Sequence, residues 1–267
     1  MVQRVVVIGN GNSSNDIAAQ VVDIAKEPVY RSIRRPPMFR FVSLPDERII
    51  DVAPVVRYTV HSTPNGQKAT VHLKDGTEIP DVDTIFFGTG YTLTYPYLYV
   101  LDPNTDNRPP VLLVTEEEQP VRIPFLYHQI LYAHNPSLAF IGALMCLTPF
   151  IMSDLCSTFL ALAWSGTLPY PDTIEARLVD DAERTALVRK LRAETDNPSN
   201  FIACQVLANQ EQSFAFGIRR EIVQVRPDFD DVFHAWTPEE FASRDAMYPK
   251  KLESLRFAKE GSGPCAE

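Results

Sequence analysis

The chain has 267 residues, of which 45% are hydrophobic and 22% are charged, as is typical of a globular protein with one or two packed domains. The net charge of −9 argues against a nucleic-acid partner, which would require a basic face. The four cysteines show neither a C-x-x-C pair nor metal-ligand spacing, and the first apolar run is too short for a signal peptide. We therefore expect a cytoplasmic protein in a reducing compartment, without a metal site.

The first 35 residues predict a β-α-β unit. Residues 2–8 form an uninterrupted β-branched run that suits a strand buried on both faces of a parallel sheet. Residues 15–26 carry apolar side chains at helical spacing, and Pro28 is expected to end that helix. Residues 29–33 are expected to form the second strand.

The next segments predict a β-meander that returns to the sheet. Strands are expected over residues 55–62, 69–73 and 84–87, separated by turn residues such as Asp75 and Gly76. The last of these strands ends in Gly88-Thr89-Gly90. We therefore expect residues 1–92 to form one domain.

Residues 93–267 begin with an irregular connection rich in proline and tyrosine. A strand is expected over residues 138–143, then helices over 153–164, with Ser153 as the N-cap, 173–194, 201–216 and 238–251. The apolar stretch 138–164 is long enough to span a membrane, but Gly142, Pro149 and Asp154 interrupt it. No membrane span is therefore expected.

The segment from Gly9 to Ser14 lies between the first strand and the first helix, where a dinucleotide-binding fingerprint belongs. Gly9 permits a tight turn, and Gly11 lets a pyrophosphate approach the backbone. Ser14 is a small residue at the third glycine position. The helix N-terminus offers unpaired N–H donors to phosphate.

The second strand predicts which dinucleotide binds. NAD-binding proteins usually carry an acidic residue at its end, whereas this chain has Ser32, Arg34 and Arg35 there. Guanidinium groups pair well with phosphate oxygens, so the sequence favours NADP(H) over NAD(H). The alternative for these arginines, and more so for Arg31 and Arg40, is a solvated basic cluster.

These motifs carry a family resemblance. V-V-V-I-G-N-G-N-S-S-N-D-I-A, at residues 5–18, resembles the second, NADPH-binding fingerprint of the flavin-containing monooxygenases. V-Y-R-S-I-R-R, at residues 29–35, resembles the strand whose serine and arginine hold the 2′-phosphate in that family. D-V-D-T-I-F-F-G-T-G-Y, at residues 81–91, is similar to the family's strand ending in A-T-G-Y, with Gly88 in place of alanine. L-A-F-I-G-A-L, at residues 138–144, resembles the stretch that rejoins the flavin domain.

The resemblance implies an α/β fold with a Rossmann-like NADP(H)-binding domain and β-meander, followed over residues 93–267 by an incomplete FAD-domain portion and an α-helical C-terminal region. It implies NADP(H) and FAD as cofactors, with O2 oxygenating a soft nitrogen or sulfur atom of a small-molecule substrate. Catalytic residues are not assigned. The predicted cofactor-binding residues are Gly9, Gly11, Asn12, Ser13, Ser14, Asp16, Ser32, Arg34, Arg35, Gly88, Thr89 and Gly90.

The departures from the family pattern leave alternatives open. The earlier G-x-G-x-x-G that cradles FAD and the F-x-G-x-x-x-H signature are absent from this sequence. The chain is therefore expected to be a partial chain of such a monooxygenase, completed by a flavin-domain partner or working as a homo-oligomer, or to be an NADP(H)-binding module or inactive remnant without redox activity. The missing C-x-x-C argues against a disulfide-reductase relative. Baeyer–Villiger monooxygenases stay an open alternative.

Overall fold

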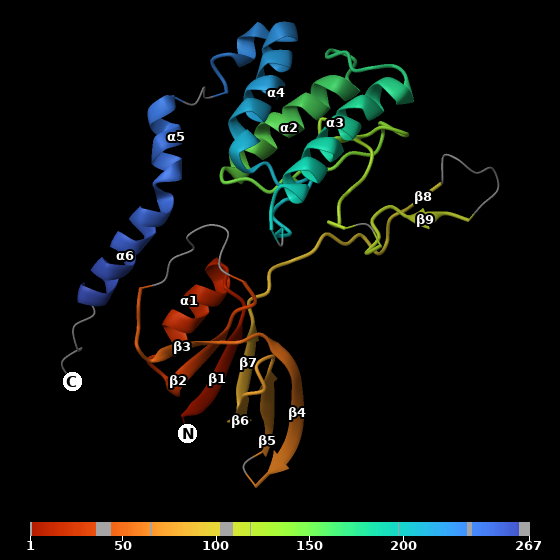
Figure 1. Ribbon diagram of the computed structural model, residues 1–267. Helices are drawn as coiled ribbons and strands as arrows, with labels where there is room; N and C mark the ends of the chain where they lie inside the picture. Colours follow the sequence, from red (N-terminus) through yellow and green to blue (C-terminus); the bar gives the residue numbers. More distant parts are fainter. Residues whose placement is uncertain are drawn as a thin grey trace. The chain divides into compact units, whose positions relative to one another are not determined.

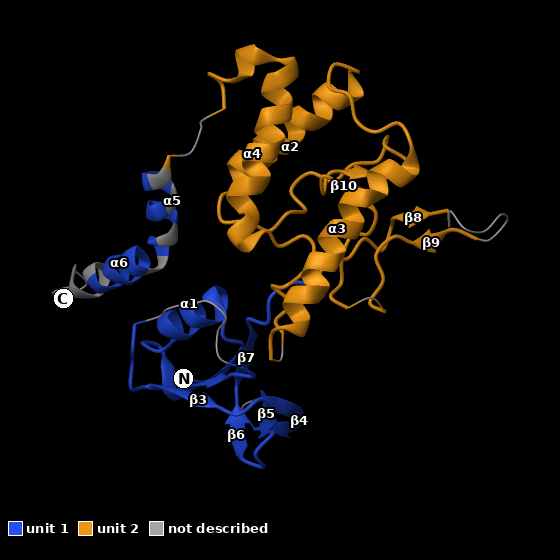
Figure 2. Cartoon of the chain, turned by 45° about the horizontal axis from the view of Figure 1, so that its top comes forward, with its two compact units in different colours: residues 1–91, 238–267 blue, residues 92–237 orange. Residues whose placement is uncertain are grey.

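The chain forms two compact units in a computed structural model that describes residues 2–35, 44–64, 66–101, 109–117, 119–196, 198–233 and 237–261. Unit 1 comprises residues 1–91 together with 238–267, and unit 2 comprises residues 92–237 (Figure 2). Residues 238–267 thus group with the first unit, not with the segment that precedes them. The division into functional domains at residues 92 and 93 stays a prediction.

Unit 1 is built on a four-stranded parallel sheet in the order β3-β2-β1-β7 (Figure 1). Its strands are β1 (Gln3–Ile8), β2 (Ala25–Ser32), β3 (Ile49–Val52) and β7 (Thr84–Phe87). Val5 and Val7 pack with Ala18 of helix α1 (Asn12–Val21), whereas Val6 packs with Val71 on the other face. Burial on both faces explains the uninterrupted apolar run of β1.

The second sheet of unit 1 is an antiparallel meander. It consists of β4 (Val55–Thr63), β5 (Gly66–Leu73) and β6 (Glu78–Val82), in the order β4-β5-β6. Strand β7 then pairs in parallel with β1, with Ile8 opposite Phe87. The predicted meander and its return to the first sheet are confirmed.

The prediction for the first helix is wrong at both ends. Helix α1 begins at Asn12 and ends at Val21, and Ala25 pairs with Gln3 in the sheet instead of continuing the helical pattern. Pro28, expected to end the helix, lies inside β2 where the register with β1 shifts. Such an irregularity tolerates a residue that has no N–H to donate.

Unit 2 contains short strand pairs and a helical bundle. The pairs are β8 (Tyr99–Val100) with β9 (Val111–Leu112), and β10 (Leu126–Tyr127) with β11 (Leu131–Tyr132). The helices are α2 (Pro149–Trp164), α3 (Ile174–Ala193) and α4 (Glu211–Val225), with 3₁₀ turns at Ala208–Gln210 and Pro227–Phe229. Phe159 of α2 and Ile222 of α4 are fully buried in the shared apolar core.

Three predictions in this unit are corrected. Residues 138–143 contribute only an isolated bridge between Ala139 and Leu131, not a strand. Helix α2 begins four residues before Ser153, with Pro149 at its first position, which suits the fixed φ of proline. The helix expected over residues 201–216 instead starts at Glu211, because the preceding residues are bonded to α3 through their carbonyl groups. The predicted α3 is confirmed, with Thr173 as its N-cap.

The C-terminal residues form two helices where one was expected. These are α5 (Pro238–Asp245) and α6 (Met247–Gly261). Lys251 of α6 forms an ion pair with Asp16 of α1. Within the described ranges, none of the helices combines the length and apolarity that crossing a membrane requires.

Candidate functional site

The candidate site lies where the carboxyl ends of β1, β2 and β7 meet. The Gly9 amide donates to the Ser32 carbonyl at 3.0 Å, and the Gly88 amide donates to the Ile8 carbonyl at 2.8 Å. The three predicted motifs, far apart in sequence, therefore end at one edge of the parallel sheet. This edge is where open α/β sheets place their ligands.

Two glycines give the loop after β1 its shape. Gly9 has φ +129°, and a Cβ there would lie 2.3 Å from the Gly88 carbonyl oxygen, so this position requires glycine. Gly11 differs, because it is extended and a Cβ there would meet no atom within 4 Å. The backbone at Gly11 thus faces open space, as a position approached by a ligand would.

Ser14 and Gly88 fit each other. A Cβ on Gly88 would lie 2.6 Å from the Ser14 Cβ, so the serine side chain fills the space that an alanine at 88 would need. The Ser14 hydroxyl also accepts a hydrogen bond from the Gly11 amide at 2.9 Å. The Ser14 Cα and N atoms would lie 2.9 and 3.0 Å from the same Cβ, so the serine side chain and the backbone of α1 together require glycine at 88.

Helix α1 directs its N-terminus at this loop. Its first internal hydrogen bond runs from the Asn15 amide to the Gly11 carbonyl, so the amides of Asn12, Ser13 and Ser14 have no acceptor within the helix. The side chain of Ser13 is exposed, and Asn12 is half-buried. These donors and the helix dipole favour an anion at this point.

Two polar residues at the end of β2, Arg31 and Ser32, are bonded to other parts of the protein. The buried Ser32 hydroxyl donates to the Ala53 carbonyl and accepts from the Val55 amide, both at 3.0 Å, so it holds the strand to its neighbours. Arg31 forms a two-pronged ion pair with Asp51 and donates to the Asn15 carboxamide at 2.6 Å. Arg31 therefore links β2 to β3 and to α1 through its side chain.

Arg34 and Arg35 follow the end of β2. Arg34 is exposed and Arg35 is half-buried. The Asn10 side-chain amide donates to the Arg35 carbonyl at 3.4 Å, which ties the glycine loop to the arginine pair. The structure thus brings these predicted residues together, whereas Arg40 lies outside the described residues.

The glycines after β7 line the same edge. Gly88 is half-buried against Ser14, while Thr89 and Gly90 are exposed. Gly90 has φ +81°, which favours glycine whatever ligand is present. Tyr91 is fully exposed.

Asp16 was predicted as a cofactor residue, but its partner was missed. The Lys251 ammonium lies 2.7 Å from the Asp16 carboxylate and 3.5 Å from the Asn12 side-chain oxygen. Only the amphipathic character of the C-terminal segment is visible in sequence. A contact between residues 235 positions apart leaves no local signal.

Unit 2 contains a second helix N-terminus, but a carboxylate already occupies it. Buried Glu211 accepts hydrogen bonds from the Leu147 and Thr148 amides, each at 2.9 Å, and from the Thr148 hydroxyl. An internal anion therefore neutralises the start of α2. Sequence reasoning missed Glu211 because it is 63 residues from Thr148.

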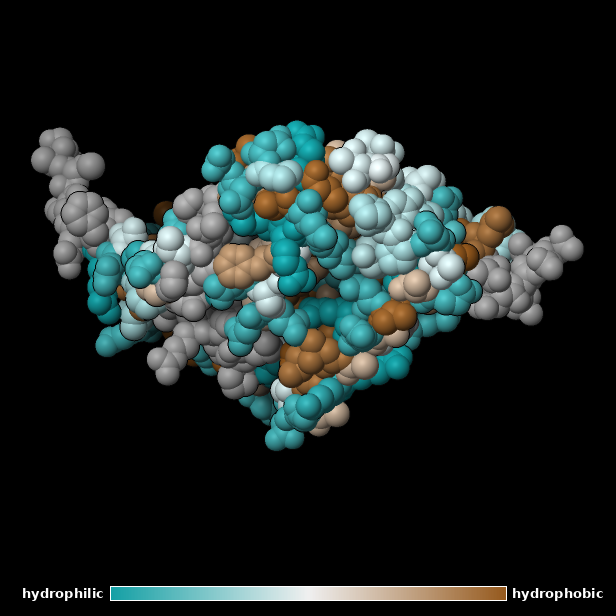
Figure 3. Space-filling model, turned by 90° about the horizontal axis from the view of Figure 1, so that it is seen from above, coloured by the Kyte–Doolittle hydropathy of each residue, from teal (hydrophilic) through white to brown (hydrophobic). Residues whose placement is uncertain are grey.

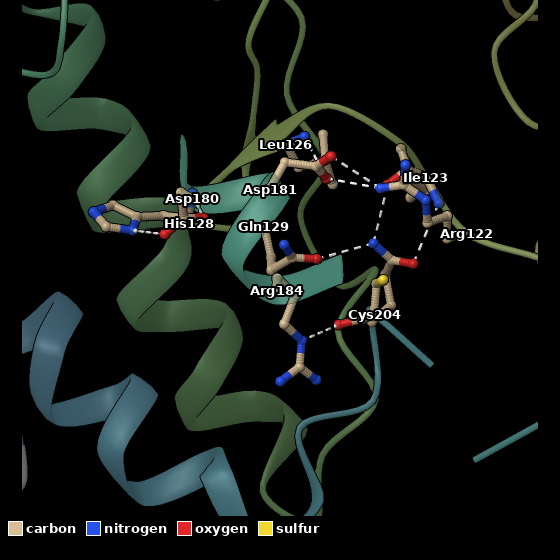
Figure 4. Close-up of polar contacts among 10 residues, drawn as sticks. Arg122, Ile123, Leu126, His128, Gln129, Asp180, Asp181, Arg184 and Cys204 are labelled. Atoms are coloured by element: carbon tan, nitrogen blue, oxygen red, sulfur yellow. Dashed lines mark hydrogen bonds and ion pairs between the residues drawn. The ribbon is translucent and has the colours of Figure 1, made fainter. Parts of the chain in front are cut away.

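A polar network joins α3 to the loops around it (Figure 4). Buried Arg122 pairs with Asp181 at 2.9 Å, and Arg184 donates to the Cys204 carbonyl at 2.8 Å. Asp181 therefore has an internal partner, and Asp180 accepts a hydrogen bond from the His128 amide at 2.9 Å. Their contacts stabilise the loops and show no arrangement of acid and base around a cavity.

His128 lies between two carboxylates of this network. Its ring is 3.5 Å from Asp180 and 3.1 Å from Glu221. Burial lowers the pKa of His128, but the hydrogen bonds to Asp180 and Glu221 outweigh it and raise the pKa to about 9. His128 is therefore a protonated structural residue near neutral pH.

The cysteines of unit 2 are unreactive thiols. Burial raises the pKa of Cys146 to about 11 and that of Cys156 to about 12, so neither is a thiolate at neutral pH. Cys204 is also a free buried thiol with a raised pKa, caused mainly by burial. Within the described ranges, no group of histidine, cysteine or acidic side chains has the arrangement of a metal site.

Comparisons with known proteins find relatives of one kind, although no protein-family model matches the chain. It is 27% identical over 64% of its length to a thiol-specific monooxygenase of Saccharomyces cerevisiae. It is 30% identical over 67% of its length to the flavin-containing monooxygenase FMO GS-OX5 of Arabidopsis thaliana. The matches cover 37% and 34% of these relatives, so the chain spans little more than a third of their length.

Solved structures share the fold. The S-allyl-L-cysteine S-oxygenase of Allium sativum matches 93% of the chain with a TM-score of 0.58 and 20% identity, over 55% of its own length. Tmm from a Pelagibacter strain matches 86% of the chain with a TM-score of 0.55 and 18% identity, over 46% of its own length.

Proposed function

We propose that this chain, a relative of the flavin-containing monooxygenases, supplies the NADP(H)-binding part of an NADPH- and FAD-dependent monooxygenase. The observation that carries the proposal is the open, glycine-lined N-terminus of α1 at the end of β1, with the arginine pair tied beside it. We interpret the parallel sheet with α1 as a Rossmann-like domain.

The residues present fit a dinucleotide. The pyrophosphate would receive hydrogen bonds from the amides at the start of α1, where Gly11 leaves room for it. The 2′-phosphate would be held by Arg34 and Arg35, because the Ser32 hydroxyl is buried and already bonded to the Ala53 carbonyl and the Val55 amide. Thr89 and Gly90 would line the same edge. Ser32, Gly88 and Asp16 would shape the site through their contacts with the protein.

The described residues do not offer a matching cradle for FAD. They contain one strand–glycine loop–helix unit, at Gly9–Ser14, and this unit fits the dinucleotide. FAD supplies the oxygen-transfer chemistry in such enzymes, so we propose that a flavin domain, in a longer chain or a partner, completes the site. Exposed apolar side chains in the segment before α2 and in its first turn, namely Ile141, Met145, Leu147 and Phe150, fit a surface covered by such a domain. Apolar patches of this kind interrupt the largely polar face shown in Figure 3.

The proposed substrate is a small molecule with a soft nitrogen or sulfur nucleophile, oxygenated with O2. Two of the proteins it resembles are named a thiol-specific monooxygenase and an S-oxygenase, which favours sulfur.

The first test compares dinucleotides by calorimetry. We expect the purified chain to bind NADP⁺ more tightly than NAD⁺, and Arg34→Ala to remove about tenfold of that preference. Arg4→Ala, which removes a guanidinium bonded to the Pro80 carbonyl, is the control. Equal affinities for both dinucleotides, or no binding by folded protein, would overturn the proposal.

A second candidate is an NADP(H)-binding module without redox activity, and it is favoured by the missing FAD cradle in the described residues. A visible absorption spectrum with added FAD, recorded while NADPH consumption is followed, separates the two. A flavin band with NADPH oxidation supports the monooxygenase. A colourless protein that NADP⁺ stabilises against heat supports the module.

A further inference from the structure

The C-terminal helix α6 brings a cation to the candidate dinucleotide site. The Lys251 Nζ atom lies 2.7 Å from the Asp16 carboxylate and 3.5 Å from the Asn12 Oδ1 atom. Asn12 is the first residue of α1, and Asp16 lies one turn further along the same face. The ammonium therefore sits over the first turn of the helix whose amides face the open space at Gly11.

The charges around this turn show what the ammonium changes. The glycine loop and the first turn of α1, residues 9–15, contain no basic side chain, whereas Asp16 adds a negative charge. A pyrophosphate beside an unpaired carboxylate would be repelled. Lys251 neutralises Asp16 and also reaches Asn12 at the start of the helix, and an ammonium has three donors, one more than these two contacts use.

We propose that Lys251 binds the pyrophosphate of the dinucleotide, so that α6 is part of the binding site. The inference rests on the proposed function, because it places a dinucleotide at the start of α1. It adds a residue that neither the glycine fingerprint nor the arginine pair contains. Its contribution is common to NADP(H) and NAD(H), because both carry the pyrophosphate.

Lys250 provides a matched control. It precedes Lys251 on α6, is exposed, and its Nζ atom bonds to the Ser243 hydroxyl of α5 at 2.8 Å. Lys250→Met removes the same charge and keeps a similar side-chain volume at a position directed elsewhere. A general effect of net charge or helix propensity would appear equally in both variants.

The experiment measures NADP⁺ and NAD⁺ binding to the full chain by calorimetry at low and high salt. We expect Lys251→Met to weaken both dinucleotides about tenfold at low salt, and the loss to shrink as salt screens the charge. Lys250→Met should bind as the unchanged protein does, and Lys251→Arg should restore most of the affinity. Arg34→Ala, in contrast, should weaken NADP⁺ alone.

A second background separates direct contact from neutralisation of Asp16. In Asp16→Asn protein, no carboxylate at this position needs a partner. Lys251→Met should still weaken binding severalfold in that background, whereas a residue that only neutralises Asp16 would have no effect there. Thermal unfolding confirms that each variant is folded, and the NADP⁺-induced rise in Tm gives an independent readout.

The outcomes distinguish this inference from the proposed function. If the unchanged chain binds neither dinucleotide, both fail. If it binds NADP⁺ and Lys251→Met binds equally well, only the role of Lys251 fails. If Lys250→Met and Lys251→Met lose the same affinity, the effect is nonspecific electrostatics and the inference is likewise wrong.

Discussion

The N-termini of α1 and α2 differ in whether the protein supplies a negatively charged acceptor for the backbone amides there. At α1, Gly11 faces open space and the first amides have no acceptor within the helix. At α2, the buried Glu211 carboxylate receives the amides of Leu147 and Thr148. A helix N-terminus is therefore available to an anionic ligand only where the protein does not supply its own anion.

Removing that internal anion should have the largest effect on the molecule. Glu211→Ala leaves two partly buried amides and a hydroxyl without their acceptor and should lower the free energy of unfolding by about 4 kcal/mol, measured with urea. Glu211→Gln keeps one oxygen acceptor and should cost about half as much. A loss under about 1 kcal/mol in Glu211→Ala would mean that water replaces the carboxylate, and the contrast with α1 would disappear.

His128 is a charged group whose counter-charges are also supplied by the protein, because both carboxylates that face its ring belong to unit 2. Its pKa is raised in the folded state to about 9, so the stabilisation is complete below the unfolded value near 6.5 and is lost as the pH rises through 9. The shift corresponds to about 3 kcal/mol at most.

The stability difference between the unchanged chain and His128→Gln, measured by urea unfolding from pH 6 to 9.5, should shrink over this window. Buried thiols add their own pH dependence only from about pH 9 upward, and it cancels in the difference. A difference independent of pH would show that the pKa of His128 is the same in the folded and the unfolded chain.

The open site at α1 depends on the close packing of Ser14 against Gly88. Gly88→Ala places a methyl group against Ser14 and should lower the free energy of unfolding by about 2 kcal/mol. Adding Ser14→Gly removes the nearest atom but leaves the backbone Cα and N of residue 14 at 2.9 and 3.0 Å, so the double variant should recover only part of the loss seen in Gly88→Ala. Additive losses in the two single variants would contradict the coupling.

Gly11→Ala should separate binding from folding with the smallest change of all. Its extended backbone and empty surroundings admit a Cβ, so only the small loss of alanine at an N-cap, about 1 kcal/mol, is expected in stability, while a Cβ in the ligand's path should weaken NADP⁺ binding about tenfold in calorimetry. Gly217→Ala, in α4 and equally uncrowded, is the control and should bind normally. Unchanged affinity in Gly11→Ala would place the ligand elsewhere.

Much of unit 1 was predictable because its signals are local. The apolar run of β1, the glycine loop and the turn residues of the meander each follow from neighbouring residues. The bounds predicted for β7, Thr84–Phe87, are those observed. Pro28 misled the prediction because a proline suits both a helix end and a strand irregularity, and only pairing with β1 decides between them.

The parts that could not be predicted depend on contacts between distant residues. Glu211 sets the start of α2 from 63 positions away, so Ser153 was the better local candidate for an N-cap. Arg184 binds the carbonyls of residues 203, 204 and 206, which prevents the helix predicted over 201–216 from starting early. Lys251 reaches Asp16 in the same way, and no spacing rule connects them.

The bond between the Asn10 carboxamide and the Arg35 carbonyl gives the two loops a common frame. A nucleotide fragment that contacts only one loop still restricts the motion of both loops, because they are bonded to each other. It gains the binding contacts of only one of them. Each mononucleotide half of the coenzyme should therefore bind more weakly than its own contacts alone would predict. Tight binding then requires the intact dinucleotide, which reaches both loops at once.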